Sequence, residues 1–488
     1  MTAIRRTVPA QTAEGPSRWS GEGVALRAIR VASLALLGSL SNAAIVDAAE
    51  PPAAAAGSDR LLVIAPESFR EALAEFLDER PRQLGEPVEF LSLEAVLADD
   101  GESADHPERI KRELHRRWKA GGLTAVLLVG DADIMPVRFM MLDRGTAPAF
   151  DTAFYPSDLY YADLARDDGS FDDWNASRDG AHAGYFGEVH GETRKSDPIN
   201  FDRISYRPEI AVGRWPVSTP EAAKAVASKT LRHQDAVAAA AAGVPSVCFI
   251  FSGGWIDNAA QARRLLRTLR EGERWAIESH AYFTPDRPAN REAAGHVFAA
   301  EPAAVFHTGH GQPWGWEGCL DRGVLAAAPA TDRPPLLFSI GCSTAVVCTL
   351  PPYEPYLDAD GREHEGTNAG EVFDDFPPAP AVLQPGRFNA GSLSEEALRR
   401  PDGGAIAVIG CVTGSQPCAH TLLDAFVEAM HREPSESAGR WWSEALGEYV
   451  RREKLMDLVP TESWYPPSIF FQGMKFIYLG DPTIRLRK

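Results

Sequence analysis

A histidine and a cysteine stand at the ends of two apolar runs, and both residue types suit acyl-transfer chemistry. The first run closes with His310 and Gly311, and the second closes with Gly341 and Cys342. A thiolate attacks a carbonyl carbon well, and an imidazole can protonate a leaving amine. Cys342 and His310 are therefore the candidate nucleophile and acid/base group for cleavage of a peptide bond.

The positions of these two residues favour chemistry over simple packing. Residues 303–307 and 335–341 have the composition of short buried strands, and in a parallel sheet both would end at the same edge. Free cysteines are usually small core residues. Two glycine-flanked strand ends about thirty residues apart nevertheless favour a dyad, with the Gly311 and Cys342 backbone amides available for an oxyanion site.

The arrangement of a His-Gly pair and a later cysteine, each after an apolar block, resembles the caspase and legumain clan of cysteine peptidases. More narrowly it resembles the gingipain family. Other stretches match that family in the same order along residues 60–488, namely Leu127–Asp133, Tyr160–Leu164, Pro208–Arg214 and Leu479–Leu486. The resemblance implies a caspase-like fold and a peptidase that acts on proteins or peptides.

One segment departs from the family pattern. In gingipains a carboxylate after the strand preceding the histidine block helps to orient the catalytic histidine, whereas here strand 247–251 is followed by Ser252. The first acid beyond it is Asp257. Three alternatives stay open, because Asp257, a distant residue or no third residue at all could serve His310.

Asp257 also has two other possible roles. An aspartate at this point commonly caps a helix, here one that starts near Asn258. By resemblance, the family's substrate-selecting acid lies shortly after the same strand, so Asp257 could instead line a pocket for an Arg or Lys side chain. Trp314 and Trp316 follow the histidine and could wall the substrate groove, or could simply pack.

Apolar strands alternate with amphipathic helices along most of the chain, which predicts an α/β fold with mostly parallel sheets flanked by helices. The family resemblance refines this to a caspase-like three-layer sandwich with two subdomains. We expect a linker at 50–59, an N-terminal α/β subdomain at 60–218 and a catalytic subdomain at 219–488. Within the latter, the proline-rich segment 349–400 is long enough to suggest a lid or a pocket wall.

Residues 1–49 are predicted to form an export signal. An apolar stretch at 31–40 follows basic residues, and small residues continue to Ala49. A membrane anchor is the alternative, but Asn42 interrupts the apolar run well short of the ~20 residues that a spanning helix needs. We expect cleavage near Ala43 or Ala49, no stable membrane insertion afterwards, and a periplasmic or extracellular protein.

The composition is that of an ordinary globular protein, with 44% hydrophobic and 24% charged residues. The formal net charge of −19 disfavours nucleic acid and anionic membranes as partners. Six cysteines are too few and too scattered for a disulfide-dense scaffold. Local bridges between Cys342 and Cys348, or between Cys411 and Cys418, stay open, and the first of these would block the nucleophile.

Residues 151–208 are acidic and show little periodicity. Clustered carboxylates attract hard cations such as calcium, although the spacing does not match an EF-hand. A structural calcium ion and a solvated surface loop are equally open interpretations, and catalysis itself needs no cofactor. The candidate ligands are Asp163, Asp167, Asp168 and Asp172, with Asp173 and Asp179 nearby.

Two rival functions remain. His307 and His310 form an H-x-x-H pair, but in a strand positions three apart face opposite sides, which disfavours a zinc site and makes His307 a core or supporting residue. The second rival is a catalytically silent exported binding protein on a gingipain-like fold, which the missing acid at Ser252 suggests. The joint presence of His310, Gly311 and Cys342 favours the peptidase.

Overall fold

The computed structural model describes most of the chain beyond residue 59. The described residues are 60–98, 105–142, 153–174, 203–240, 244–252, 259–271, 274–277, 289–374, 377–387, 392–459, 469–470 and 472–487. The expected signal and linker, Asp179 and Asp257 lie outside them.

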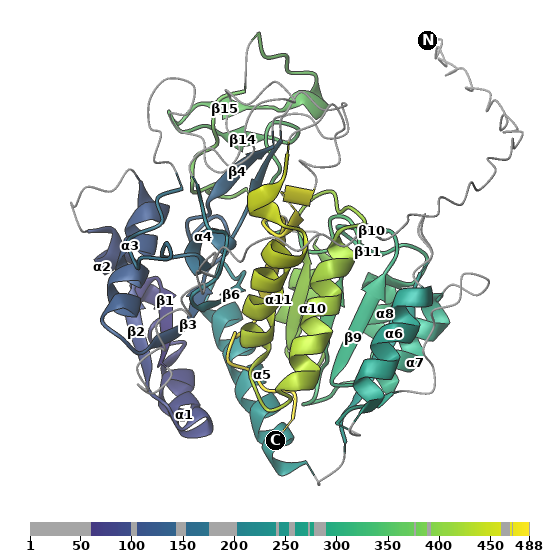
Figure 1. The fold of residues 1–488 in the computed structure, drawn as a ribbon. Coiled ribbons are helices and arrows are strands. Elements are labelled where there is room, and N and C mark those ends of the chain that lie inside the picture. Colours follow the sequence, from purple (N-terminus) through teal and green to yellow (C-terminus); the bar gives the residue numbers. More distant parts are fainter. Residues whose placement is uncertain are drawn as a thin grey trace, which may run out of the picture. The chain divides into compact units, whose positions relative to one another are not determined.

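A ten-stranded sheet runs through the described part of the chain (Figure 1). Every pairing within it is parallel except that of β16 with β17. This confirms the expected mostly parallel α/β fold. In spatial order the strands are β2 (Val88–Ser92), β1 (Arg60–Ala65), β3 (Leu123–Val129), β6 (Ala211–Trp215), β17 (Phe476–Leu479), β16 (Ala407–Cys411), β13 (Leu336–Ser339), β9 (Ala304–Thr308), β7 (Ser246–Phe251) and β8 (Ala276–Ile277).

Eleven α-helices accompany the sheet in the described residues, and α10 and α11 lie in front of it in Figure 1. They are α1 (Ala74–Leu84), α2 (Leu93–Leu97), α3 (His106–Lys119), α4 (Leu159–Ala162), α5 (Pro220–Ala239), α6 (Ala259–Arg270), α7 (Arg291–Ala299), α8 (Arg322–Ala327), α9 (Leu393–Arg399), α10 (Ala419–Arg432) and α11 (Ala438–Arg452). α5 begins as its sequence predicts, with Pro220 in its first turn and the Thr219 hydroxyl accepting a hydrogen bond from the Ala222 amide.

Successive side chains of the central strands pack against different helical layers. Phe338 of β13 contacts Phe426 of α10, with ring centroids 5.3 Å apart. The preceding residue, Leu337, lines a pocket with Leu325 of α8 and Ala397 of α9. Because successive residues of a strand point to opposite faces, helices cover both faces of the sheet, as a three-layer sandwich requires.

The proline-rich segment after β13 is not structureless. It contains the short strands β14 (Tyr356–Leu357) and β15 (Glu363–His364), which pair with each other, and the 3-10 helix η5 (Thr367–Ala369). The amide of Val137 donates to the carbonyl of Val382, and the amide of Gln384 donates to the carbonyl of Ala132. The segment is thus tied to the turn after β3, near β4 (Phe139–Leu142) and β5 (Ala153–Pro156). Its role as a lid stays a prediction.

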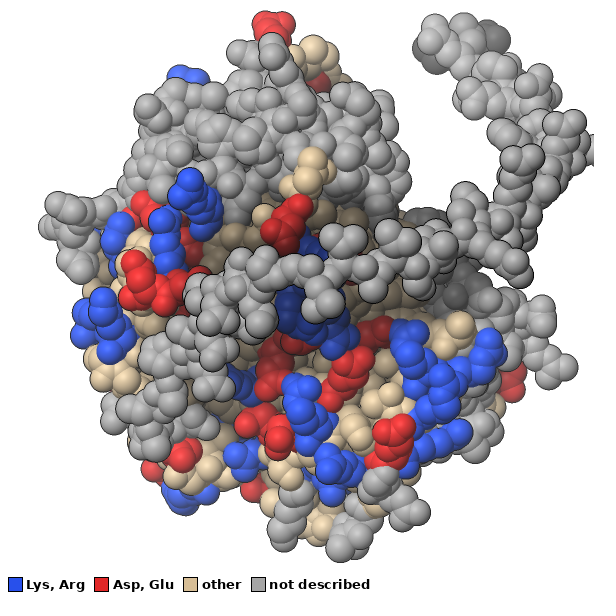
Figure 2. Space-filling view, in the orientation of Figure 1, with Lys and Arg blue, Asp and Glu red and all other residues tan. Residues whose placement is uncertain are grey.

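The sheet is continuous across the expected subdomain boundary at 218/219, which falls between β6 and α5. The end of β17 pairs with β6 at one position, Leu479 with Arg214. The boundary itself stays a prediction. Within the described residues, no helix is both long and apolar enough to cross a bilayer. On the face shown in Figure 2, Lys and Arg side chains are interspersed with Asp and Glu.

Candidate active site

The ends of β9 and β13 lie side by side in the sheet. Ser339 pairs with His307, and the amide of Ile340 donates to the carbonyl of His307 at 3.1 Å. The turns that carry His310 and Cys342 therefore leave neighbouring parallel strands at the same edge. This is the arrangement that the sequence predicted for the two candidate residues.

Two glycines let these turns touch through their backbones. A Cβ atom on Gly311 would lie 2.3 Å from Cγ2 of Thr344 and 2.6 Å from the carbonyl oxygen of Cys342. A Cβ on Gly341 would lie 2.9 Å from the backbone nitrogen of Gly311. Any side chain at either position would force the turns apart, which would separate His310 from Cys342. Gly311 also begins β10 (Gly311–Gln312), which pairs with β11 (Gly315–Trp316), itself paired with β12 (Leu320–Asp321).

The sulfur of Cys342 is half-buried and contacts a third loop, which follows β16. The amide N–H of Ser415 donates to Sγ at 3.3 Å, and the thiol faces the Ser415 carbonyl oxygen at 3.6 Å. The next residue, Ser343, has a φ of 53°, a value that non-glycine residues rarely adopt. Its amide donates to the carbonyl of Thr413 at 2.7 Å, so the same loop holds both residues of the turn.

His310 is exposed, in contrast to His307, which is buried near the end of β9. Among the described residues, none offers the His310 ring a hydrogen-bond partner. Asp257, one expected orienting residue, lies outside the described part of the chain. The described residues therefore supply a histidine and a cysteine but no third group that orients the histidine.

His307 is a buried structural residue. One ring nitrogen lies 2.7 Å from the hydroxyl of Ser252 and the other 2.7 Å from the hydroxyl of Ser339. The ring stacks on Trp316 at a centroid distance of 4.3 Å. Burial lowers the pKa of His307 to about 3, so the ring is neutral at physiological pH. With both nitrogens engaged, His307 does not act as a metal ligand together with His310.

Ser252 therefore has a role of its own at the position where the family pattern has a carboxylate. It hydrogen-bonds to the buried His307, and its amide donates to the carbonyl of Thr308 at 3.2 Å. A carboxylate in the same place would face a neutral, buried ring. The departure from the pattern thus coincides with a serine–histidine–serine chain inside the sheet.

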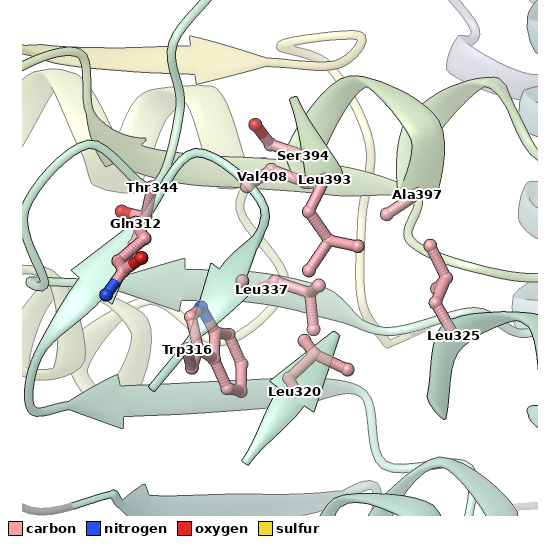
Figure 3. Close-up of a pocket in the computed structure, with 11 residues that line it drawn as sticks. Gln312, Trp316, Leu320, Leu325, Leu337, Thr344, Leu393, Ser394, Ala397 and Val408 are labelled. Carbon is pink, nitrogen blue, oxygen red and sulfur yellow. The ribbon is translucent and has the colours of Figure 1, made fainter. Parts of the chain in front are cut away.

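The two candidate tryptophans have different surroundings. Trp314 is 59% exposed in the turn between β10 and β11, whereas Trp316 is buried against His307. Trp316 also lines a narrow, mainly apolar pocket together with Gln312 of β10 and Leu320 of β12 (Figure 3). The cavity has a volume of about 20 Å³, which is little more than one water molecule requires. Its lining includes Gln312, Thr344 and Ser394 but no charged residue.

Of the four acidic residues considered for calcium, Asp163 and Asp172 both bond to Ser205, whereas Asp167 and Asp168 lie at the surface. Asp163 is fully buried and accepts hydrogen bonds from the Trp174 indole and the Tyr206 amide, whereas Asp167 is exposed and lies 3.7 Å from Arg207. Asp168 bonds to Ser170 at the surface, and Asp172 is buried against Ser205. In the described ranges, no three His, Cys, Asp or Glu side chains are grouped so as to hold a metal ion.

A buried lysine adds to the positive charge that Arg166 and Arg207 bring to this region. Nζ of Lys111 is buried over the rings of Tyr160 and Trp174, at 4.6 and 4.9 Å from their centroids. Burial lowers the pKa of Lys111 to about 8, and the nearby Asp163 and Asp172 oppose this effect. Burial likewise raises the pKa of Asp163 well above its ordinary value.

All six cysteines are free thiols, so neither local bridge forms in this structure. Only Cys342 is partly accessible, and the other five are buried. Burial raises the pKa of Cys411 to about 12 and that of Cys418 to about 11, which makes both poor nucleophiles.

The loop at 413–416 was not predicted from the sequence. Ser415 contacts the candidate nucleophile although it lies more than seventy residues further along the chain. The apolar run that became β16 and the glycine after it were visible, and by the same strand-end logic they pointed to this edge. Nothing in the residue types of Ser415 or of its partner Gln472 indicated a role.

Comparisons with known proteins agree with this geometry. The model of peptidase family C25 matches residues 55–487. The structure resembles that of the Arg-specific cysteine proteinase gingipain R, with a TM-score of 0.53, 14% identity, and coverage of 87% of this chain and 78% of that one. A second structure, described only as a protease, gives a TM-score of 0.54 at 15% identity and covers 88% and 78%. At identities this low, the similarity to these two structures establishes the fold alone. No curated protein sequence matches the chain significantly.

Proposed function

Because the chain belongs to peptidase family C25, the gingipain family, we propose that it is an exported cysteine endopeptidase with Cys342 as nucleophile and His310 as acid/base group. The observation that carries this proposal is the contact between the two glycine turns, which follow adjacent strands at one edge of the sheet. The other five thiols are buried and cannot meet a polypeptide substrate.

The proposed reaction proceeds through an acyl-enzyme. The Cys342 thiolate attacks the scissile carbonyl carbon, and the backbone amides of Gly311 and Cys342 stabilise the resulting oxyanion. His310 then protonates the leaving amine as the C–N bond breaks. A water molecule, deprotonated by His310, hydrolyses the thioester and regenerates the thiol. No cofactor takes part in these steps.

Substrate contacts follow from what lies around His310. Trp314 is exposed beside the turn and is positioned to contact a bound peptide, whereas Trp316 supports the turn from below. A preference for an Arg or Lys side chain would rest on Asp257. The gingipain R structure is described as Arg-specific, which motivates testing basic residues first.

A peptide library tests the enzyme directly. The purified mature protein is incubated with a positional-scanning library, with Cys342→Ala as the control. We expect cleavage by the wild type alone, whereas absence of cleavage by both proteins would defeat the proposal. Replacing Asp257 by Asn then separates the roles, since loss of only the basic preference marks a selectivity residue and a general loss of rate marks an orienting residue.

The silent binding protein is a separate outcome, which is favoured by the lack of a hydrogen-bond partner for the His310 ring among the residues that the structure describes. An iodoacetamide probe at mildly acidic to neutral pH discriminates, because an activated thiolate reacts faster than an ordinary thiol. Selective labelling of Cys342 that is lost in His310→Ala supports the enzyme. Labelling no faster than that of a small thiol supports the binding protein.

The structural calcium ion and the export signal remain proposals. Chelation followed by thermal melting tests the ion, and an unchanged midpoint would contradict it. Export is tested by N-terminal sequencing of protein recovered from outside the cytoplasm, with cleavage expected near Ala43 or Ala49.

A further inference from the structure

The candidate nucleophile contacts a loop that takes no part in the proposed Cys342–His310 dyad. The loop at 413–416 presents the Ser415 amide to the Cys342 sulfur at 3.3 Å and the Thr413 carbonyl to the Ser343 amide at 2.7 Å. Ser415 itself is almost completely buried. Both contacts are made by the backbone of the loop, so their geometry depends on whatever fixes that loop.

A single buried glutamine fixes it. The side-chain amide of Gln472 donates from Nε2 to the Ser415 hydroxyl at 3.0 Å, and its Oε1 accepts from the Gln416 amide at 3.1 Å. Gln472 is fully buried, so neither end of its amide has water as an alternative partner. One bond holds the Ser415 side chain, and the other holds the N–H of the peptide unit that joins Ser415 to Gln416.

A lysine three residues further on supports the other end of the loop. Lys475 is buried, and its ammonium donates to the carbonyl of Gly414 at 3.4 Å. Its backbone carbonyl also accepts from the Val412 amide at 2.8 Å. The segment that leads into β17 therefore holds the loop after β16 along its whole length.

We propose that Gln472 is a positioning residue for the nucleophile, which keeps the Ser415 N–H aimed at the Cys342 sulfur so that the thiolate receives a backbone hydrogen bond. This inference rests on the proposed function only in that Cys342 is the reacting group. It adds a donor to the site that is distinct from the imidazole and from the two oxyanion amides.

The chemistry follows from the two contacts between Ser415 and the sulfur. In the thiol form the S–H faces the Ser415 carbonyl while the sulfur accepts weakly from the Ser415 amide. When the proton leaves, the first contact disappears and the second becomes a hydrogen bond to an anion, which is stronger than one to a neutral group. A correctly held loop therefore favours the thiolate.

The experiment measures the rate of Cys342 alkylation by iodoacetamide between pH 5 and 10 in the full-length mature protein. The variant Gln472→Met keeps the length of the side chain and removes both hydrogen bonds. We expect the midpoint of its pH profile to rise by about half to one pH unit, as loss of part of one charge-assisted bond implies. The kcat/KM for peptide cleavage should fall near neutral pH and recover partly at higher pH.

Gln384 provides a matched control. It is also fully buried and bonded at both ends of its amide, with Oε1 accepting from the Leu357 amide and Nε2 donating to the Leu357 and Ala381 carbonyls, each at 2.8 Å. Gln384→Met should cost comparable stability but leave the alkylation profile of Cys342 unchanged. A smaller change, Ser415→Ala, removes only the hydroxyl that Gln472 bonds, and we expect a smaller upward shift. It serves as the test if Gln472→Met does not fold.

The outcomes separate this inference from the proposed function. If wild-type Cys342 is no more reactive than a small thiol, the proposed function fails. If wild-type Cys342 is activated but its profile is the same in Gln472→Met, or in Ser415→Ala where the former is insoluble, the positioning role of Gln472 is overturned. An equal shift in Gln384→Met would show that general loosening, rather than this loop, moves the profile.

Discussion

Two buried arginines near the strands β1 to β6 are each paired with a carboxylate, whereas His310 and Cys342, beyond the ends of β9 and β13, remain at least partly accessible. Arg214 of β6 makes a two-bond ion pair with Asp158, at 2.8 and 2.7 Å, and both side chains are buried. Arg80 of α1 pairs with Asp481 with both side chains fully buried. Beyond the ends of β9 and β13, His310 is exposed and has no hydrogen-bond partner among the described residues, and the sulfur of Cys342 makes only weak contacts.

This difference separates buried ion pairs from the two residues that we propose to be catalytic. Arg214 and Asp481 belong to stretches that resemble the gingipain family, and each is committed to a buried ion pair. Such a pair is costly to break, because the remaining charge is stranded away from water. Cys342 and His310 are accessible enough for a substrate to reach. A residue that matches a family pattern can therefore serve folding or chemistry. A side chain that is buried and fully paired serves folding.

The largest expected effect is on activity, when Cys342 or His310 is replaced. We expect Cys342→Ala and His310→Ala each to lower kcat/KM at least a thousandfold, as removal of a member of a catalytic pair does. Because both side chains are at least partly accessible, the melting temperature should barely change. Peptide cleavage and thermal melting check this. The buried Cys248 is the control, since Cys248→Ala should retain activity and lose stability.

The next effect is on folding, in the paired region. Arg214→Met leaves the buried Asp158 without its partner and should lower the free energy of unfolding by about 3–5 kcal/mol. Urea unfolding measures it. The matched control is Arg82→Met on α1, where the arginine pairs with Asp78 at the surface and should contribute less than about 1 kcal/mol. Similar losses of unfolding free energy in the two variants would show that the buried ion pair contributes no more than the exposed one.

The third effect depends on pH and concerns the buried histidine three residues before His310. The pKa of His307 is about 3 in the folded protein against an ordinary value of 6.5, so below pH 6.5 the unfolded chain takes up a proton that the folded one refuses. The stability from a neutral His307 is present above pH 6.5 and is lost progressively as the pH falls toward 3.

The variant His307→Gln removes that titration. Between pH 7 and pH 4 the wild type should lose about 3 kcal/mol more unfolding free energy than the variant, measured by urea unfolding at the two pH values. Losses that were the same in both proteins would mean that His307 takes up its proton without disturbing the fold. Other acid-sensitive groups are common to both proteins and cancel in the difference.

The smallest effect concerns substrate contact. Trp314→Ala should raise KM two- to fivefold, on the order of 0.5–1 kcal/mol, with kcat and the melting temperature unchanged, since the side chain is exposed. Trp316→Ala should instead destabilise the fold by about 3 kcal/mol or more, because it removes a buried ring that stacks on His307. Steady-state kinetics and melting curves on both variants test whether the two tryptophans divide in this way.

Much of the sheet was predictable because its strands are continuous apolar runs. The runs at 123–129, 247–251, 303–307 and 335–341 became β3, β7, β9 and β13 within one to two residues at each end. Helix α9 was missed inside a segment dominated by prolines. The antiparallel direction of β17 was also not foreseen, because an apolar run of four residues reads the same in either direction.

The strands, the glycines beside them and the two residues capable of the chemistry could be identified from the sequence alone, because hydrophobic periodicity and residue type are local properties. Which polar groups meet depends on how the chain packs in three dimensions. This packing paired Ser252 with His307, placed Lys111 among the acidic residues, and brought the loop held by Gln472 against Cys342. Those contacts join residues 50 to more than 70 positions apart, and only the packing of the sheet edge fixes their distances.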